Sequence, residues 1–582
     1  MQHPLTRSVS AVLGWFFICT IAQLPGTAIA SAQPTKSTQA TLLGFDEARH
    51  LLNRTSFAAQ SAEIDDYAKL TREQAVDQLL SETRRIAAYP APAWTAKYER
   101  VYKPDMTQEQ RQQANRRELV ERGLEIRTWW VAEMLSTPSP LTEKMTLFWH
   151  NHFATSQQKV RSAILMYRQN VMLRNYSTGN FGAMLREVSK DPAMVIYLDG
   201  AQNRKGAPNE NFGREVMELF TLGEGHYSEQ DIKEVARAFT GWSIDADAGE
   251  FRFRRPAHDD GSKIVFGVEG KFNGDDIVTL LLQQPATSIF IVSKLWREFV
   301  SPEPDAVAVA QLAATWRGAN YEMKPLLRAM FLSDAFWAPV NRSVLVKSPV
   351  DLVVGSLRQF RFAVGDPAPF AVILRQLGQD LFNPPNVKGW PVGDAWLNTT
   401  TLLARKGFLN RLFRADEMVK PATVVATKSE KADAADMGNM MGQPAATSAQ
   451  SNTVTALPTA QLMDKDMAGQ GRQRAQMRLA ARGNGADTQD GGAIAVANLP
   501  PFGVSNQLRG QYFFNAEQWF AQYPLQKLAA QPMANDATLQ AQGDERVWHT
   551  VLAGPPVQAS KDVPRNLAGL RTLALDPMYQ LK

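Results

Sequence analysis

The sequence is almost free of cysteine. Cys19 is the only one among 582 residues, and it lies in a stretch that we predict is removed after export. A chain without cysteine forms no disulfide, has no thiol nucleophile and holds no cysteine-ligated metal. Its stability must therefore come from burial of apolar side chains, which a chain of this length can supply.

Several short catalytic motifs are also missing. The chain has no G-x-S-x-G elbow, no H-E-x-x-H, no Walker A motif and no G-x-G-x-x-G placed after a strand, so no haem or nucleotide motif is evident. The net charge of +5 is small for the length, and no basic run is dense enough for a nucleic-acid groove. Six histidines remain once the amino-terminal stretch is removed: His50, His150, His152, His226, His258 and His549.

The amino-terminal 30 residues have the pattern of a signal peptide. Arg7 precedes the apolar run 11–22, and Ala28 and Ala30 form a small-x-small cleavage site. No later apolar run reaches 18 residues, so we expect no transmembrane segment in the mature chain. The sequence thus predicts an exported protein, periplasmic or secreted after cleavage near Ala30.

Composition divides the rest of the chain. Residues 31–41 read as a polar tether, and helical periodicity dominates 42–414. No aromatic residue occurs between Phe413 and Phe502, and we interpret 415–498 as a disordered low-complexity insertion. Residues 499–582 then read as a C-terminal helical segment that packs back on the main domain. The predicted fold is mainly α, a large multi-helix domain built of helical hairpins.

One β-hairpin is expected near 251–267. The stretches 251–254 and 263–267 alternate like short strands around an intervening turn. His258 and Asp259 in that turn are candidate metal ligands, although Asp-Gly chemistry alone accounts for the same residues as a turn.

The stretch from Pro208 to Trp242 predicts an antiparallel helical hairpin. A first helix over about 210–222 ends at Gly223, and a second opens with a capping box of Ser228 and Asp231 and ends at Gly241. On the first helix, one side is apolar and the other collects polar side chains: Asn211, Arg214, Glu215 and Glu218.

Two interpretations of this polar stripe stay open. It is a solvated face with an Arg214–Glu218 pair at i,i+4 spacing, or a buried site for acid/base or metal chemistry. In the second case Arg214, Glu215 and Glu218 are candidate catalytic residues, Asn211 orients the carboxylates, and a divalent cation such as Ca²⁺ or Mg²⁺ is a candidate cofactor. Glu210 is a further candidate metal ligand.

The preceding segment LFWHNHF carries two histidines, His150 and His152. On a regular helix, positions i and i+2 do not share a face, so the two cannot bind one ion unless the helix ends between them. His150 is a candidate metal ligand, and His152 a candidate catalytic residue or a core histidine.

The stretch 381–400 is dense in proline, glycine and tryptophan. We call it the Trp-rich loop. Lys388, Trp390 and Trp396 are candidate binding residues, because indoles stack on sugar rings or partners. The alternative is that the indoles plug the core beneath the loop.

Long motifs in this order resemble a known family: LLNRTSF, FWHNHFATS, NENFGREVMELFTLGEGHYSEQDIKEVARAFTGW, HDDGSKIVFG and PPNVKGWPVGDAWLN. The chain resembles the bacterial family named domain of unknown function 1800, from about residue 42 to 412 and again in the last helix. The resemblance implies an exported, mostly helical protein without an established activity. Such proteins are often encoded beside exported proteins of domain of unknown function 1501, which look sulfatase-like, and this suggests a partner.

Two functions remain open at this point. One is a cell-envelope protein with a hydrolase-like or metal-binding site on the hairpin 208–242. The other is a non-catalytic accessory or scaffold protein that binds a neighbouring exported sulfatase-like protein or an envelope polymer.

Overall fold

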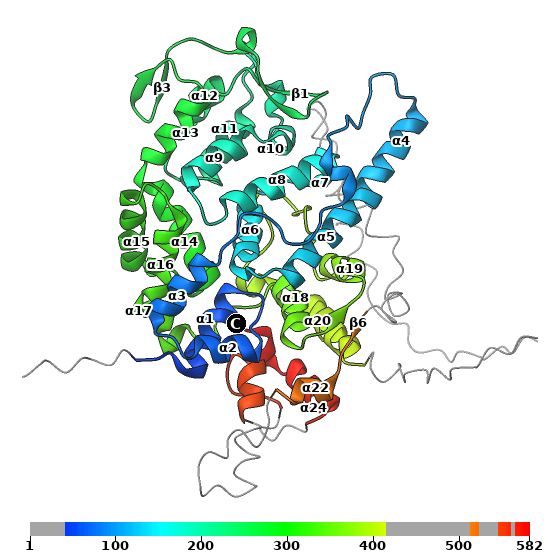
Figure 1. Ribbon diagram of the computed structural model, residues 1–582. Helices are drawn as coiled ribbons and strands as arrows, with labels where there is room; N and C mark the ends of the chain where they lie inside the picture. Colours follow the sequence, from blue (N-terminus) through cyan, green and yellow to red (C-terminus); the bar gives the residue numbers. More distant parts are fainter. Residues whose placement is uncertain (1–40, 415–511, 523–544, 560–564) are drawn as a thin grey trace, which may run out of the picture.

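The computed structural model describes residues 41–414, 512–522, 545–559 and 565–582 (Figure 1). The predicted signal peptide (1–30) and low-complexity insertion (415–498) lie outside these residues, as does nearly all of the predicted tether. Within them the protein is mainly helical, as predicted, and the strands are short.

The α-helices follow one another in chain order as α1 (Gly44–Thr55), α2 (Ser61–Tyr67), α3 (Arg72–Ser81), α4 (Gln108–Arg116), α5 (Arg122–Ser136), α6 (Pro140–His152), α7 (Gln157–Val160), α8 (Ala163–Tyr176), α9 (Phe181–Lys190), α10 (Pro192–Tyr197), α11 (Glu210–Glu218), α12 (Glu229–Ala238), α13 (Gly274–Gln283), α14 (Pro285–Phe299), α15 (Ala306–Gly318), α16 (Met323–Leu332), α17 (Asp334–Trp337), α18 (Pro349–Gln359), α19 (Ala368–Gln376), α20 (Thr399–Leu412), α22 (Ala516–Phe520) and α24 (Leu567–Leu575). Shorter helical pieces are η1 (Ala93–Ala96), the π-helical η2 (Arg117–Glu121), η3 (Gly200–Gln202), η4 (Arg255–Ala257), η5 (Pro339–Asn341), η6 (Gly393–Trp396), η10 (Pro577–Gln580) and residues 545–551.

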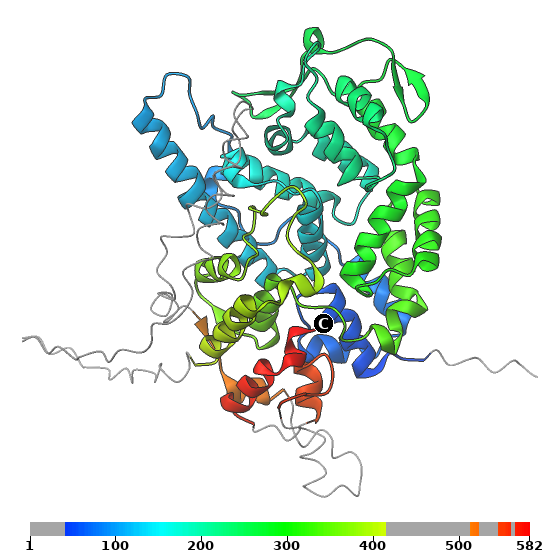
Figure 2. The same ribbon diagram turned by 180° about the vertical axis from the view of Figure 1, so that it is seen from behind.

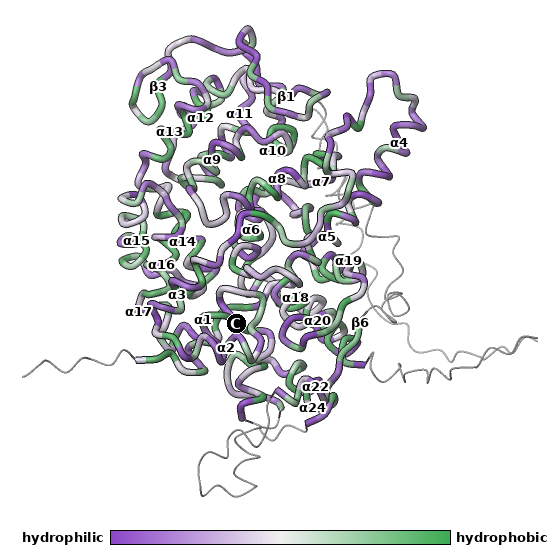
Figure 3. Tube along the Cα trace, in the orientation of Figure 1, coloured by the Kyte–Doolittle hydropathy of each residue, from purple (hydrophilic) through white to green (hydrophobic). Residues whose placement is uncertain are grey.

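Local capping chemistry sets many of the helix starts. Thr71 and Gln74 form a capping box at the start of α3, and Ser228 and Asp231 form the predicted one at the start of α12. Pro140 begins α6, where its missing N–H costs no hydrogen bond. Residues 108–136 form α4, η2 and α5 in sequence. Of these, α4 has no buried residue and projects from the body as a hydrophilic arm (Figure 3).

Two hydrophobic clusters form the core, and α6 contributes to both. The first gathers apolar side chains of α1–α3, α9 and α11–α17, together with Met145 and Trp149 of α6. The second gathers those of α5, α18–α20 and the C-terminal pieces, together with Leu147 of α6. Because α6 is buried on nearly all sides, polar side chains that it carries must find partners inside the protein.

The observed pairing of the strands contradicts one prediction. Residues 251–254 and 263–267 do not pair with each other. Instead β2 (Glu250–Phe253) pairs with β1 (Trp242–Asp245), and β3 (Lys263–Val265) pairs with β4 (Val268–Gly270). In each case the partner is the strand across the tighter turn, which closes a smaller loop. Alternation identifies a strand but not its partner, so the pattern could not show this.

The C-terminal pieces pack against the main domain, at the bottom of the views in Figures 1 and 2. Strand β6 (Tyr512–Phe513) pairs with β5 (Ala363–Val364), and Leu581 forms a β-bridge with Val346. Helix α24 contacts α20. The last residues thereby reach the start of α18, beside α6.

Within the described part of the chain, no single helix has the length and apolar character needed to cross a membrane. Helices α13 and α14 meet that criterion only when they are taken together, and a bend of 75° separates them.

Candidate functional site

The predicted helical hairpin exists, as α11 and α12. Phe212 and Val216 of α11 are buried. The helix ends at Glu218, earlier than the predicted end near 222, and a turn follows to Gly223, which adopts a left-handed φ of +80°. On the polar side, Arg214 donates two 3.0 Å hydrogen bonds to Glu229 of α12 and lies 3.8 Å from Glu210. The expected i,i+4 pair of Arg214 with Glu218 is therefore replaced by a pair that crosses the hairpin.

The two carboxylates of the stripe are half-buried. Glu218 accepts a 2.7 Å hydrogen bond from the Tyr227 hydroxyl. Burial, followed by the charge of Glu218, raises the pKa of Glu215, and Arg214 and Lys388 oppose that shift. Asn211 does not orient either carboxylate, because its amide donates to the Leu198 carbonyl at 3.2 Å.

His150 lies in an aromatic pocket of the core. Its ring is 5.3 Å from Trp130, 5.4 Å from Phe382 and 5.5 Å from Trp390, measured between centroids. Neither ring nitrogen has a hydrogen-bond partner, and burial lowers the pKa of His150 to about 3. Helix α6 continues through both histidines, so His150 and His152 lie on different sides of it, as the spacing predicted.

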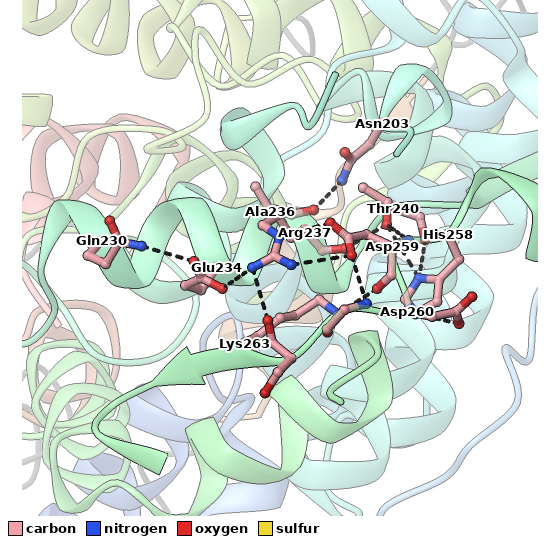
Figure 4. Close-up of polar contacts among 12 residues, drawn as sticks. Asn203, Gln230, Glu234, Ala236, Arg237, Thr240, His258, Asp259, Asp260 and Lys263 are labelled. Atoms are coloured by element: carbon pink, nitrogen blue, oxygen red, sulfur yellow. Dashed lines mark hydrogen bonds and ion pairs between the residues drawn. The ribbon is translucent and has the colours of Figure 1, made fainter. Parts of the chain in front are cut away.

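The loop after β2 is held by protein cations. Asp259 accepts hydrogen bonds from Arg237 at 2.8 and 3.3 Å, which are the first cause of its pKa of about 2. Lys263 donates to the backbone carbonyls of Asp259 and Gly261, and His258 donates through Nδ1 to the Thr240 carbonyl at 2.9 Å (Figure 4). These contacts are those of a stabilised turn.

The four predicted metal ligands are not brought together. Glu210 lies beside Arg214, Asp259 is paired with Arg237, and His150 is enclosed by aromatic rings on α6. Across the described residues, no group of three or more histidine, aspartate or glutamate side chains is arranged to hold a metal ion. The hairpin therefore offers paired side chains and no cluster of free ligands.

A pocket of about 390 Å³ opens instead between α6, α14 and the Trp-rich loop. Its walls carry five cations, two carboxylates, a histidine and two indoles. The lining residues are Lys144, Leu147, Phe148, Asn151, His152, Lys294, Arg297, Glu298, Leu345, Val346, Ser348, Asp351, Gln379, Lys388, Trp390, Pro391, Val392, Gly393, Trp396 and Lys582. Four of the predicted site residues are among them: His152, Lys388, Trp390 and Trp396.

The inner end of the pocket is charge-balanced. Asp351 accepts hydrogen bonds from Lys144 at 2.6 Å and from Lys582 at 2.8 Å, and Glu298 lies 3.5 and 3.2 Å from the same two lysines. Burial alone would raise the pKa of Asp351, but Lys144 and Lys582 together lower it well below its ordinary value. This end is an internal ion-pair network.

The outer end carries cations without matching carboxylates. Lys294 hydrogen-bonds His152 at 3.1 Å, and neither Lys294 nor the exposed Arg297 forms an ion pair among the described residues. Lys388 lies 3.7 Å from Glu224 in an exposed pair. Burial, and then Arg297, lower the pKa of Lys294 to about 8.

The tautomer of His152 follows from its partners. Its Nε2 lies 3.1 Å from the Phe220 carbonyl, which can only accept, so Nε2 carries the proton. Its Nδ1 is then free to accept from Lys294. Burial, with the charge of Lys294, keeps the pKa of His152 well below its ordinary value, so the ring is neutral.

The Trp-rich loop is fastened to α6 at Asn151. The backbone N–H of Trp390 donates to Asn151 Oδ1 at 2.6 Å. Gly389 has a φ of +86°, and a Cβ there would lie 2.2 Å from the same oxygen. Only glycine fits this approach. Trp390 and Trp396 are 3% and 4% exposed, so the loop plugs the core while its inner surface forms the pocket wall.

A comparison with family models matches residues 50–503 to "Protein of unknown function (DUF1800)". The match covers more than half of the chain. The chain belongs to the DUF1800 family. A search of curated proteins and a search of solved structures each found no match. The resemblance that the motifs indicated is therefore confirmed, and the functional interpretation of this DUF1800 chain rests on its own geometry.

Apart from Lys388, the sequence did not reveal the lysines of the pocket. Lys294 and Lys144 each lie singly within a helix, without a spacing that marks a site. The only local sequence signal at Asp351 is Ser348, because Ser-Pro-Val-Asp forms the capping box of α18. Glu215, Glu218 and Arg214 do not line the pocket, but the hairpin borders it, because Phe220 contacts His152 and Glu224 contacts Lys388.

Proposed function

We propose that this DUF1800 protein is exported and binds an anionic ligand in the pocket between α6, α14 and the Trp-rich loop. The observation that supports binding is the set of cations at the outer end: Lys294, Arg297 and Lys388 line the pocket, and the first two form no ion pair within the described ranges of the chain. A cation held in a partly buried pocket attracts an anion more strongly than one in open solvent.

The shape of the pocket limits the ligand. A volume of about 390 Å³ is at the small end of the range for small-molecule sites. Carboxylate, sulfate or phosphate groups would accept hydrogen bonds from Lys294 and Arg297, and Trp396 and Val392 give the wall an apolar part. The favoured class is a small organic anion, such as an acidic sugar.

Titration calorimetry tests the binding. The full chain is titrated with sodium sulfate and with sodium glucuronate at constant ionic strength. Lys294→Met and Arg297→Met should each weaken binding about tenfold or more, because a hydrogen bond to a charged group contributes about 1.5–3 kcal/mol. Lys324→Met, which removes an exposed lysine of α16 outside the pocket, should leave binding unchanged. Equal affinity in all four proteins, or no binding to the unmodified chain, would refute the proposal.

Export rests on the amino-terminal pattern. Residues 1–30 combine Arg7, an apolar run and an Ala-x-Ala site. Amino-terminal sequencing of protein recovered from the periplasm or medium should begin at Ser31. An intact Met1 on that material would contradict export.

A second candidate is hydrolysis at the rim of the pocket. Glu215 favours this candidate. Its pKa is raised, and an acid with a raised pKa is suited to proton transfer. The charge of Lys388, which lines the pocket, acts on Glu215 and partly opposes that shift. Under this candidate, Glu215→Gln would abolish turnover of a bound acidic glycoside and leave glucuronate affinity unchanged. Retained turnover would eliminate it.

A further inference from the structure

Lys294 differs from the other lysines of the pocket in its surroundings. Lys144 and Lys582 each hydrogen-bond Asp351, and Lys388 is 66% exposed and lies near Glu224. Lys294 is half-buried, and among the described residues its hydrogen-bond partner is the neutral imidazole of His152. No carboxylate in the described part of the chain forms an ion pair with this pocket amine.

The neighbours of Lys294 favour the neutral amine. Arg297, one turn later on α14, adds a like charge, and Phe290, one turn earlier, places its ring 4.8 Å from Nζ. The ring face gives the ammonium some attraction, but less than a carboxylate would. Desolvation next to another cation is the arrangement that activates lysines as nucleophiles.

We propose that Lys294 is a nucleophilic residue that captures a small aldehyde or ketone bearing an anionic group, and holds it as an imine in the pocket. This rests on the proposed function, because Arg297 and Lys388 would bind the anionic group of the same ligand. Both line the same pocket as Lys294.

The covalent step balances without another reactant. The lone pair of the Lys294 amine forms a bond to the carbonyl carbon, and the C=O π electrons move to oxygen. One N–H proton leaves through His152 Nδ1, 3.1 Å away, and returns to that oxygen, which gives a carbinolamine. Loss of this hydroxyl as water, with the second N–H proton, forms the C=N bond. His152 is suited to the transfer because its Nε2 proton is hydrogen-bonded to the Phe220 carbonyl and its Nδ1 carries no proton.

The titration of Lys294 agrees with this geometry. Its pKa of about 8 reflects burial first and Arg297 second. The charged and titratable groups around it in the pocket wall are His152 of α6, Glu298 and Arg297 of α14 and Lys388 of the Trp-rich loop. Near pH 7 an appreciable fraction of Lys294 is therefore the free amine, unlike an ordinary lysine with a pKa near 10.4.

Reductive labelling tests the proposal. The full chain is treated at pH 7 with limiting glyoxylate and sodium cyanoborohydride, which converts an imine into a stable carboxymethyl-lysine. Peptide mass mapping then compares Lys294 with Lys388 at the pocket rim and with Lys69, which is 71% exposed and outside the pocket. Lys294 should react about tenfold faster than either, since its larger free-amine fraction outweighs the lower nucleophilicity of a weaker base.

Two controls separate the possible outcomes. Glycolaldehyde, which is neutral, should lose the preference for Lys294 if the anionic group is recognised. Lys294→Arg removes the amine and should lose the fast label, whereas Lys324→Met, outside the pocket, should keep both the label on Lys294 and sulfate binding. If Lys294 reacts no faster than Lys69 while sulfate still binds, the covalent proposal is overturned and the anion pocket stands. If sulfate does not bind either, both proposals are overturned.

Discussion

The helical hairpin and the outer end of the pocket differ in whether their charged side chains have partners. On the hairpin, Arg214 is matched by Glu229 on the facing helix, and Glu218 by the Tyr227 hydroxyl. At the outer end of the pocket, Lys294 meets only a neutral imidazole, and Arg297 has no partner among the described residues. A side chain that is already paired has little capacity left for a ligand, whereas an unmatched charge in a cavity retains it.

The same contrast divides the pocket itself. The inner end around Asp351 is buried and balanced, and the outer end is cationic and open. Buried ion pairs contribute little net stability when complete but cost several kcal/mol when one partner is removed. The inner end thus supports the structure, and the outer end is available for function. Substitutions can test this division.

The largest effect is expected at Asp351. Asp351→Asn would leave Lys144 and Lys582 without their shared hydrogen-bonded carboxylate in the interior, and we expect a loss of about 3–5 kcal/mol in the free energy of unfolding. Urea denaturation measures it. Asp77→Asn, which breaks an exposed pair with Arg328, is the matched control and should change stability by less than about 1 kcal/mol. Similar losses in both variants would mean that the inner network is not a structural element.

The next effect concerns the attachment of the Trp-rich loop. Gly389→Ala places a methyl group against Asn151 at a positive φ, whereas Gly225→Ala has a similar φ of +83° and open space. We expect Gly225→Ala to cost about 1 kcal/mol from backbone strain, and Gly389→Ala at least about 1 kcal/mol more from the steric clash. Gly389→Ala should also weaken sulfate binding, because the loop forms a pocket wall. Equal costs at the two glycines would show that the loop accommodates the methyl group.

The smallest effect distinguishes the two carboxylates of the hairpin. Because burial and Glu218 raise the pKa of Glu215, the folded protein holds that proton more tightly than the unfolded chain, and the charged form costs stability at pH 7. Glu215→Gln should therefore stabilise the protein by up to about 0.5 kcal/mol at pH 7. The gain should vanish as the pH falls through the folded pKa toward the unfolded value.

Glu218→Gln is the matched comparison. It replaces the charged acceptor of the Tyr227 hydroxyl and should cost about 0.5–1 kcal/mol at pH 7. Thermal unfolding of both variants between pH 4 and pH 8 measures the opposite signs. A loss of stability in Glu215→Gln at pH 7 would show that its carboxylate is paired.

Local signals predicted much of the fold. Helix periodicity predicted the helical class, and the capping box at Ser228 together with Gly223 predicted the hairpin. Strand pairing was wrong for 251–254, because alternation carries no information on the partner. For the candidate site, Trp390, Trp396 and Lys388 could be selected from the unusual loop, and His152 from its helix.

The rest of the site depends on contacts between distant residues. Arg214 pairs with Glu229 on the facing helix instead of Glu218, and spacing within one helix cannot reveal a partner on another helix. Lys294 differs from the other lysines of the pocket wall, Lys144, Lys388 and Lys582, in forming no ion pair among the described residues, and this is a property of the folded surroundings. No residue near it in sequence marks that difference.

The position of Lys582 has a consequence for the order of assembly. Its side chain closes the inner wall of the pocket against Asp351, 231 positions earlier, and Asp351 in turn meets Lys144, 207 positions earlier. Contacts of such long sequence separation form late and slowly in folding. A chain made from its amino end can complete its hairpins early, but it cannot close the inner wall of the pocket until the segment around Lys582 has been made.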